Sequence, residues 1–360
     1  MRIWGSLAVY RDRRMAAILA MGFASGLPLA LTGSTLAIWL AERHLSMTAI
    51  GLFAGVGLAY TLKFLWAPLA DRLTLPLLSR LGRRRGWALA IEAALMLALL
   101  ALGATDPARA PLTVALAALA VAFFSASQDI VIDAFRVELL DDREQGAGAA
   151  ATQVGYRIGM LASTVGALYL STYFGWFVAY ATMAALLFIG MASVLLIHEP
   201  QVPAAAQRTS GWDALVVQPF AEFLRRDTAW TILGFVVLYK FGDALAGFMS
   251  NPFYYVLGFT PIEIANVAKL IGLAASVAGV VAGGGIVYRV GILPALLLCG
   301  AAQMLSNLMY VAQLWAGPDE AVLALTIAVE NIAGGMSSAA FVAYLSRLCN
   351  PAFTATQYAL

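Results

Sequence analysis

Residues 122–136 read AFFSASQDIVIDAFR and place two aspartates and an arginine inside a long apolar run. If this stretch is helical, four polar or charged side chains share one face within an arc of about 80°. They are Ser125, Asp129, Asp133 and Arg136. A charged side chain at membrane depth is costly unless it pairs or faces a wet cavity. The stretch therefore predicts a membrane helix that lines a polar path, which is typical of a protein that moves a polar compound through a bilayer.

The composition of the whole chain indicates a membrane protein. It is 62% hydrophobic and only 12% charged, with a mean hydropathy of +0.83, whereas a soluble domain carries about twice that charge. Apolar stretches of about 18–25 residues recur along its length, which favours helical spans over barrel strands. The net charge of +2 gives no sign of nucleic-acid binding. We expect an all-α integral membrane protein surrounded by lipid.

The apolar stretches predict ten complete spans and the start of an eleventh near Phe353. The complete spans fall near 15–40, 48–68, 86–104, 112–138, 147–171, 175–197, 229–256, 261–287, 291–314 and 320–345.

Basic residues outside the spans gather on one side, which places the N-terminus and the 198–228 connection in the cytoplasm. Six spans, a long connection and a second set of spans are typical of a two-bundle transporter. We predict an N-terminal six-helix bundle at 1–197, a cytoplasmic linker at 198–228 and an incomplete C-terminal bundle at 229–360. A short repeat supports this division, since AATQ at 150–153 opens the fifth span as TATQ at 354–357 opens the eleventh. The chain is expected to be truncated in that eleventh span.

Few residues are available for catalysis or metal binding. The two histidines and the two cysteines are scattered through the chain, so we expect no metal site, no cofactor and no structural disulfide. An intramembrane enzyme would need a metal-ligand cluster or a nucleophile with a base. We therefore predict a transporter and not an enzyme.

Buried carboxylates are the candidates for proton coupling. Asp129 has no basic neighbour on its own helix, whereas Asp133 can instead form a simple packing pair with Arg136. The other candidates are Asp243 in the seventh span, beside Lys240, and Glu330 near the middle of the tenth.

Polar and basic side chains within the spans are the candidates for binding a sugar or a carboxylate. They are Lys63, Gln128, Gln153, Tyr156, Arg157, Lys240, Lys269 and Asn331. For Arg157 the alternative is that it neutralises an aspartate of the fourth span. The small residues Gly155, Gly159 and Ser163 predict a close helix contact.

The loop after the second span is similar to the signature loop of the major facilitator superfamily. It contains Asp71-Arg72 and then Gly82 with three arginines, although Ala67 stands at the first glycine position and residues 73–81 form an insert. The resemblance implies a gating role for Asp71 and Arg72, while the arginines at 83–85 could serve topology alone.

Several segments together resemble the AmpG-type muropeptide permeases of that superfamily. They are GFASGLPLALT at 22–32, YTLKFLWAP at 60–68, QDIVIDA at 128–134, GYRIGM at 155–160, YKFGD at 239–243, ENIAGGM at 330–336 and FTATQY at 353–358. They run in order along nearly the whole chain.

This resemblance implies proton-driven import of anhydro-muropeptides across the bacterial inner membrane for cell-wall recycling. The expected partners are a small glycopeptide substrate and protons. Side chains alone leave two alternatives open: a carrier of another large anionic metabolite such as acetyl-coenzyme A, or an exporter of a small amphiphile.

Overall fold

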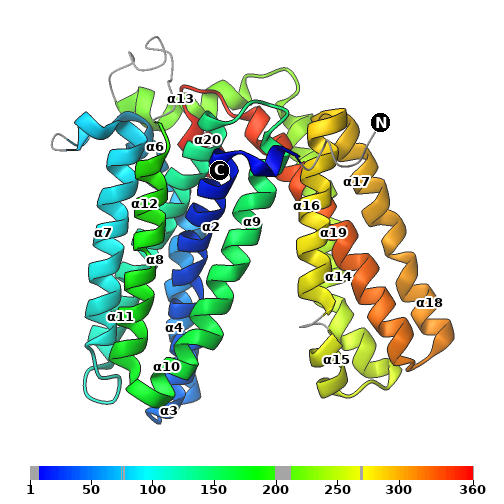
Figure 1. The fold of residues 1–360 in the computed structure, drawn as a ribbon, viewed down its shortest axis with the longest axis horizontal. Helices are drawn as coiled ribbons and strands as arrows, with labels where there is room; N and C mark the ends of the chain where they lie inside the picture. The colour runs from blue at the N-terminus through cyan, green and yellow to red at the C-terminus, as the bar shows by residue number, and fades with distance from the viewer. Residues whose placement is uncertain (1–7, 74, 76–77, 199–211, 268–270, 360) are drawn as a thin grey trace. The chain divides into compact units, whose positions relative to one another are not determined.

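The structure is a computed structural model that describes residues 8–73, 75, 78–198, 212–267 and 271–359. The part of the chain that it describes contains helices and no strand, as expected for a chain whose backbone must satisfy its own hydrogen bonds in lipid. Figure 1 shows the helices with the labels used below.

The helices of the first five predicted spans begin after a short 3-10 turn at Ala8–Arg11. They are α2 (Arg13–Thr32), α3 (Ser34–Glu42), α4 (Met47–Phe53), α5 (Leu58–Leu62), α6 (Ala67–Arg72), α7 (Arg83–Gly103), α8 (Pro111–Leu139), α9 (Gln145–Leu161) and α10 (Ala167–Phe174). Short 3-10 turns at Ala54–Gly57, Lys63–Leu65 and Ser79–Leu81, and a π-helical turn at Ala162–Gly166, link some of them.

The remaining helices run from the sixth predicted span to the last described residues. They are α11 (Trp176–Leu186), α12 (Phe188–Leu196), α13 (Trp212–Leu224), α14 (Ala229–Leu257), α15 (Pro261–Val267), α16 (Leu273–Val290), α17 (Ile292–Ser306), α18 (Leu308–Ala316), α19 (Glu320–Leu348) and α20 (Thr354–Ala359).

Sequence signals at the helix ends explain two of these boundaries. The Asp12 side chain accepts a hydrogen bond from the Arg14 backbone N–H at 2.8 Å and so caps the N-terminus of α2, a role that aspartate commonly has. Gly175 separates α10 from α11 with φ of +86°, a conformation that residues with a Cβ rarely adopt.

Nine helical segments among the described residues are long and apolar enough to cross a membrane. They correspond to nine of the ten complete spans predicted. The fifth, predicted at 147–171, is helical in α9 and α10, which a π-helical turn separates, and it is not among the nine. Helix α13 lies inside the 198–228 connection and was not predicted, and residues 199–211 lie outside the described part.

The chain folds into two compact units. One comprises residues 11–139, 151–219 and 349–360, and is called the first unit here; the other comprises residues 1–10, 140–150 and 220–348, and is called the second unit. Short segments of each predicted half belong to the unit formed mainly by the other half. The predicted division of the chain at 197 and 228 therefore stays a prediction.

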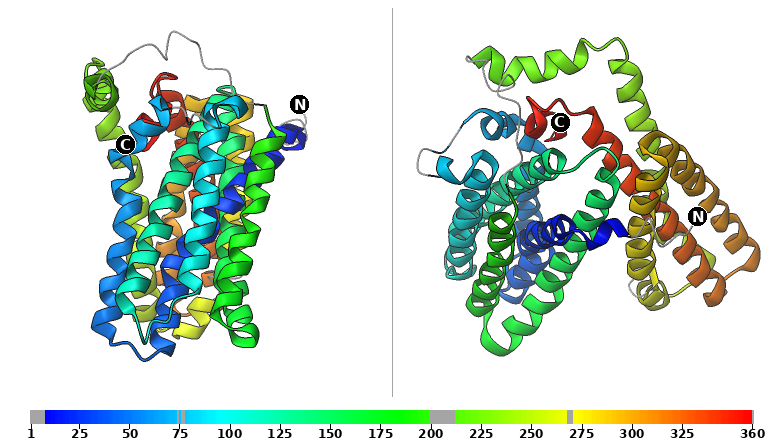
Figure 2. Two further views of the ribbon diagram at one scale, coloured as in Figure 1. Left: turned by 90° about the vertical axis from the view of Figure 1, so that its left-hand side faces the viewer. Right: turned by 45° about the horizontal axis from the view of Figure 1, so that its top comes forward.

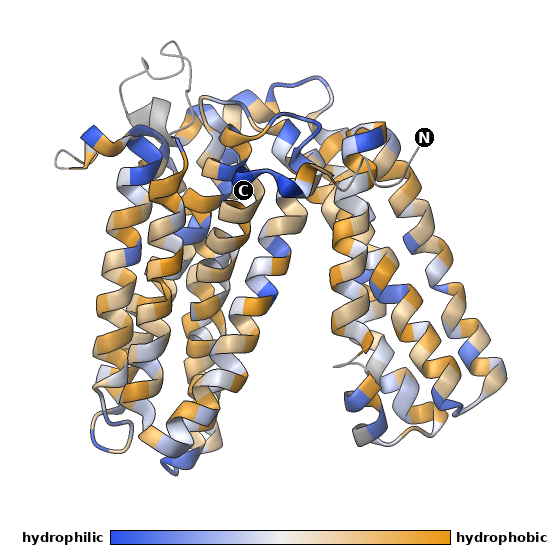
Figure 3. Cartoon of the chain, viewed as in Figure 1, coloured by the Kyte–Doolittle hydropathy of each residue, from blue (hydrophilic) through white to orange (hydrophobic). Residues whose placement is uncertain are grey.

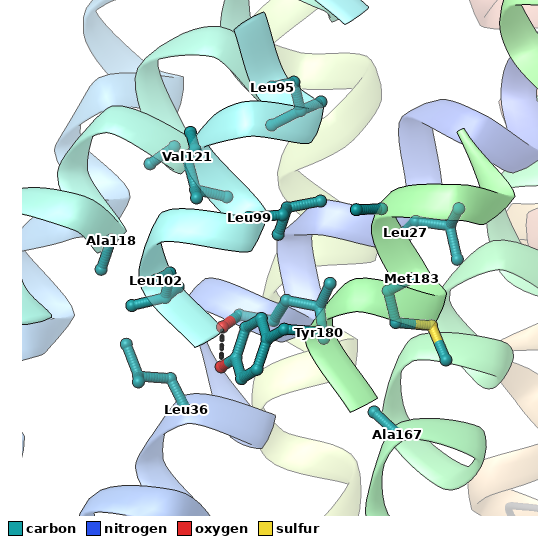
Figure 4. Packing of buried hydrophobic residues seen from close by; sticks show 14 of the residues in the cluster. Leu27, Leu36, Leu95, Leu99, Leu102, Ala118, Val121, Ala167, Tyr180 and Met183 are labelled. Atoms are coloured by element: carbon teal, nitrogen blue, oxygen red, sulfur yellow. Dashed lines mark hydrogen bonds between the residues drawn. The ribbon is translucent and has the colours of Figure 1, made fainter. Parts of the chain in front are cut away.

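The core of the first unit lies where α2, α3, α7, α8 and α11 meet. The Trp39 and Trp176 rings stack at 5.3 Å, and the Tyr180 hydroxyl donates to the Leu31 carbonyl oxygen at 3.0 Å. Figure 4 shows that hydrogen bond among leucines of α3 and α7. Helices α7 and α8 run side by side in both views of Figure 2.

Helices α2 and α9 of the first unit touch backbone to backbone. Gly22 and Gly26 face the backbone at Thr152 and Tyr156, and a Cβ on any of these glycines would collide with a carbonyl oxygen. Gly155 and Gly159 face the α2 backbone in the same way. The predicted close contact at Gly155 and Gly159 is therefore confirmed.

The second unit is built around α19, against which α16 and α17 pack. Gly279 and Gly283 of α16 lie against the α19 backbone at Ile332 and Met336. Within this unit the Tyr10 hydroxyl donates to the Val281 carbonyl oxygen at 2.9 Å, beside Gly284. In Figure 3 the helix bodies are mostly hydrophobic, with hydrophilic residues concentrated in the connections at their ends.

Candidate functional site

Asp129 lies in a polar cluster of the first unit, to which α2, the second predicted span, α8 and α9 contribute. Its Oδ1 accepts a hydrogen bond from the Ser25 hydroxyl of α2, and its Oδ2 lies 4.0 Å from Lys63 Nζ. The carboxylate side chain is 15% exposed and the Lys63 side chain 23% exposed. The hydroxyls of Tyr60 and Tyr156 lie within electrostatic range of Asp129.

This cluster joins three of the predicted candidates, Asp129, Lys63 and Tyr156, with two residues that sequence reasoning missed, Ser25 and Tyr60. Lys63 and Asp129 are 66 positions apart in the sequence, so no local spacing predicts their contact. Ser25 was overlooked because a serine in an apolar helix commonly bonds its own backbone. Asp129 in this cluster can bind a proton and release it. Lys63 can also exchange the Asp129 carboxylate for a carboxylate of a ligand.

Arg157 on α9 is half-buried and forms no hydrogen bond or ion pair with any residue that the structure describes. The alternative that it neutralises an aspartate of α8 is therefore wrong: Lys63 approaches Asp129, and Arg136 approaches Asp133 at 3.7 Å. A guanidinium without a protein anion can receive a carboxylate from a ligand.

The predicted Asp133–Arg136 pair is present within α8. Arg136 is buried and its guanidinium also lies over the Tyr358 ring of α20, 5.3 Å from the ring centre. The pair is therefore part of the contact between α8 and α20, whether or not Asp133 also carries a proton.

Gln128 is fully buried between α7 and α8, where its Nε2 donates to Glu92 Oε1 at 3.0 Å. Its partner Glu92 was not singled out in the sequence, because one glutamate in the third span has no patterned neighbour. Gln153, by contrast, is half-buried on α9.

The Asp71 carboxylate lies at the start of α20 within the first unit. It accepts hydrogen bonds from the backbone N–H groups of Ala355 (3.0 Å) and Thr356 (2.9 Å), and from the Thr356 hydroxyl (2.7 Å). Arg72 stacks over the Phe353 ring at 5.2 Å. Both residues of the predicted gate thus contact the segment that leads into α20.

Arg84 is the buried cation of this network, and it does more than set topology. With its side chain 1% exposed, it donates to Asp71 Oδ1 at 2.8 Å and to Glu138 Oε2 at 3.1 Å. Glu138 of α8 is itself 4% exposed. Sequence analysis allowed Arg84 a topological role alone and did not single out Glu138, because charges next to a helix end are typical of the surface.

In the second unit, Lys240 Nζ lies 3.0 Å from Asp243 Oδ2 on α14, so the predicted pair forms. The Lys240 ammonium also lies over the Phe341 ring of α19 at 5.3 Å. Asp243 lines a cavity of about 350 Å³ between α14, α17 and α19, together with Tyr239, Gln303, Asn307 and Ser337.

Glu330 of α19 is half-buried beside the Tyr310 hydroxyl, and Tyr310 is in turn beside Tyr254. Asp243 lies within electrostatic range of Glu330. Asn331 donates to the Ile327 carbonyl oxygen of its own helix at 2.8 Å. Lys269 lies outside the described residues.

Within the described ranges no group of three histidine, cysteine, aspartate or glutamate side chains could hold a metal ion. The polar groups instead form ion pairs and hydrogen-bonded clusters, which suit the binding and release of a polar solute.

Comparison with known proteins assigns both the fold and a set of relatives. The family model of the Major Facilitator Superfamily matches residues 18–360. The anhydromuropeptide permease of Escherichia coli strain K12 is 42% identical over 358 residues, covering 98% of this chain and 72% of that protein. The putative transporter AmpG 4 of Rickettsia felis is 36% identical over 357 residues, covering 98% and 86%.

Solved structures with little sequence identity have the same fold. The proton:xylose symporter XylE aligns with a TM-score of 0.60 at 14% identity, covering 99% of this chain and 85% of that one. A bacterial homologue of the iron transporter ferroportin aligns with a TM-score of 0.65 at 12% identity, covering 96% and 86%.

Proposed function

This chain belongs to the AmpG-type permeases of the Major Facilitator Superfamily, and from that premise we propose that it imports anhydro-muropeptides for cell-wall recycling. It is a multi-pass membrane transporter. The proposed substrates are GlcNAc-anhydro-MurNAc and its peptides, which carry sugar hydroxyls and peptide carboxylates. We propose that protons drive their uptake across the bacterial inner membrane.

The observation that carries the proposal is the half-buried Arg157, which has no anionic partner among the described residues. A cation kept inside a membrane bundle is costly unless something compensates it. A peptide carboxylate would supply that compensation through two parallel hydrogen bonds. The neighbouring Tyr156 and Gln153 offer donors and acceptors for sugar hydroxyls.

Proton coupling is proposed to run through Asp129 and Lys63. While Asp129 is ionised, its charge competes with any substrate carboxylate for the Lys63 ammonium 4.0 Å away. A proton on Asp129 removes that competition, so proton binding and anion binding favour each other, as symport requires. Asp133, Asp243 and Glu330 remain further candidates for a proton, as Lys240, Lys269 and Asn331 do for substrate.

Asp71 and Arg72 are proposed to gate the pathway by holding or releasing α20. Asp71 makes three hydrogen bonds to the first turn of that helix. Exchange of those bonds for water would free α20, and this is a discrete two-state change of the kind that gating needs.

We propose that the N-terminus and the 198–228 linker lie in the cytoplasm, following the excess of basic residues on that side. The six-helix bundle at 1–197 and the bundle at 229–360 are the proposed transport halves. Reporter fusions after residue 198 should be active on the cytoplasmic side only, and periplasmic activity would reverse the topology.

The test is uptake of labelled anhydro-muropeptide into proteoliposomes under an imposed pH gradient. Asp129→Asn should abolish gradient-driven accumulation while leaving exchange of labelled for unlabelled substrate. Asp106→Asn, in the loop between α7 and α8, is the matched control and should behave as wild type. Uptake by Asp129→Asn at the wild-type rate with unchanged pH dependence would remove Asp129 from the mechanism.

Competition in the same vesicles separates the alternatives. Excess unlabelled anhydro-muropeptide should abolish the signal, and acetyl-coenzyme A should not. Inhibition by acetyl-coenzyme A with saturable uptake of that compound would favour a carrier of another large anion. Net outward movement of a small amphiphile would favour an exporter.

A further inference from the structure

Glu92 of α7 and Gln128 of α8 form an isolated polar pair in the interior of the first unit. Both side chains are fully buried. Gln128 Nε2 donates to Glu92 Oε1 at 3.0 Å. The other two oxygens of the pair, Glu92 Oε2 and Gln128 Oε1, have no hydrogen-bond partner among the residues that the structure describes.

No described charged group compensates Glu92. From α12, Gly190 lies against the carboxyl, and a Cβ there would meet Glu92 Oε1 and the Ala24 side chain of α2. The nearby Ser193 hydroxyl donates to the Gly190 carbonyl oxygen instead. On α7 itself, Arg84 lies two turns away and is held by Asp71 and Glu138.

The next residue of α8, Asp129, does not approach Glu92 as an ion-pair partner. Its carboxylate is held by Ser25 and lies near Lys63. From the four helices packed around Glu92, then, Gln128 is the one polar partner among the described residues.

An ionised carboxylate in this position would be a buried charge without a counter-charge, which proteins avoid by neutralising the group. Two acceptor oxygens without partners are also costly in a dry interior. A single proton on Glu92 Oε2 resolves both problems, because the resulting O–H can donate to Gln128 Oε1. The pair then makes two reciprocal hydrogen bonds, and every side-chain oxygen of the pair has a partner.

We propose that Glu92 is held as a neutral carboxylic acid in a reciprocal pair with Gln128, and that this pair fixes the turn of α8 that presents Asp129. Glu92 is then a positioning residue that stays protonated through the transport cycle, and Gln128 serves α7 instead of the substrate. The positioning part rests on the proposed role of Asp129, whereas the neutral pair does not.

The protonation state is tested by infrared spectroscopy of the purified full chain near neutral pH. A protonated-carboxyl stretch should be present in the wild type and missing from Glu92→Gln, and it should persist in the control Glu138→Gln. A Glu92→Gln difference spectrum with carboxylate bands and no protonated-carboxyl band would overturn the proposal.

The pairing is tested by thermal unfolding in detergent. Glu92→Gln should unfold at the wild-type temperature, because the new amide donates to Gln128 Oε1 and accepts from Gln128 Nε2. Gln128→Glu should unfold earlier, and the exchange Glu92→Gln with Gln128→Glu should restore stability. Failure of the exchange to restore it would show that a specific acid–amide pair is not what holds α7 to α8.

The positioning role is tested by uptake in proteoliposomes. Glu92→Gln should keep the initial rate within about twofold and leave the pH profile unchanged. Gln128→Leu should lower the rate at least tenfold and move the pH profile, since Asp129 shifts against Lys63. Loss of uptake in Glu92→Gln at normal stability would instead make Glu92 part of the proton path. If the wild type itself takes up no anhydro-muropeptide, the proposed function fails, and spectroscopy and unfolding still decide the pair.

Discussion

Asp71 and Thr356 are joined by two hydrogen bonds, although they are 285 positions apart in the sequence. The Asp71 carboxylate accepts from the Thr356 backbone N–H at 2.9 Å and from its hydroxyl at 2.7 Å. The same carboxylate pairs with the buried Arg84. One side chain therefore caps α20 and compensates a cation in the interior of the first unit.

Replacing Asp71 should destabilise the protein strongly. Asp71→Asn removes one of the two anions around Arg84, and breaking a buried pair costs about 3 kcal/mol or more. Thr356→Val, which removes the hydroxyl alone, should cost about 1 kcal/mol. The free energy of unfolding in detergent measures both. Asp106→Asn, whose partner Arg109 is 88% exposed, should change it by less than about 0.5 kcal/mol; equal losses for Asp71→Asn and Asp106→Asn would refute the prediction.

Lys63 and Asp129 should be energetically coupled. A double-mutant cycle with Lys63→Met and Asp129→Asn should give an interaction of about 0.5–3 kcal/mol in unfolding free energy, because the two charges share one partly buried cluster. The comparison cycle pairs Lys63→Met with Asp106→Asn in a distant loop and should be additive within about 0.5 kcal/mol. Additivity in both cycles would mean that the approach of Lys63 to Asp129 at 4.0 Å contributes nothing to the free energy of unfolding.

The contact between α2 and α9 should not tolerate a methyl group. Gly155→Ala would put a Cβ against the Leu19 carbonyl oxygen, and overpacking of this kind costs about 1–3 kcal/mol. Gly51→Ala on α4, where open space surrounds the position, should leave the unfolding temperature unchanged or raise it. A Gly155→Ala protein as stable as the Gly51→Ala protein would contradict the backbone contact.

The cap of α2 should make stability depend on pH at the acidic end. Hydrogen bonds from the Arg14 side chain and backbone lower the pKa of Asp12. Its stabilising effect should therefore be complete above the unfolded pKa of about 3.9 and be lost as the pH falls below it. Asp12→Ala should cost about 1 kcal/mol near pH 7, and this cost should shrink as the pH falls below about 3.9. If the stability difference between the wild type and Asp12→Ala were the same at neutral and acidic pH, Asp12 would not be the source of the pH dependence.

The spans could be predicted because the length of an apolar helix is set by the bilayer, which the sequence records directly. The α2–α9 contact could be predicted at Gly155 and Gly159 because small residues four apart are a local pattern. The Lys240–Asp243 pair likewise lies within one helical turn.

Contacts between distant segments could not be predicted in the same way. Neither the approach of Lys63 to Asp129 nor the pairing of Glu92 with Gln128 follows from a spacing, because each depends on how two helices are rotated against one another. Arg84 was interpreted as a topological charge. Its burial depends on Glu138 of α8, which is 54 positions away, and no local spacing connects the two residues. Helix α13 was missed because the length of a connection does not define its conformation.

The glycine contact also limits how the first unit can deform. Two helices whose main chains touch, with no side chains between them, cannot slide or tilt against each other without collision. We therefore expect α2 and α9 to move as one rigid body. Bending is then expected where each helix loses regularity, namely at Pro28 and the break at Gly33 in α2, and in the widened turn at Ala162–Gly166 that follows α9. We expect these positions to act as hinges for the pair of helices.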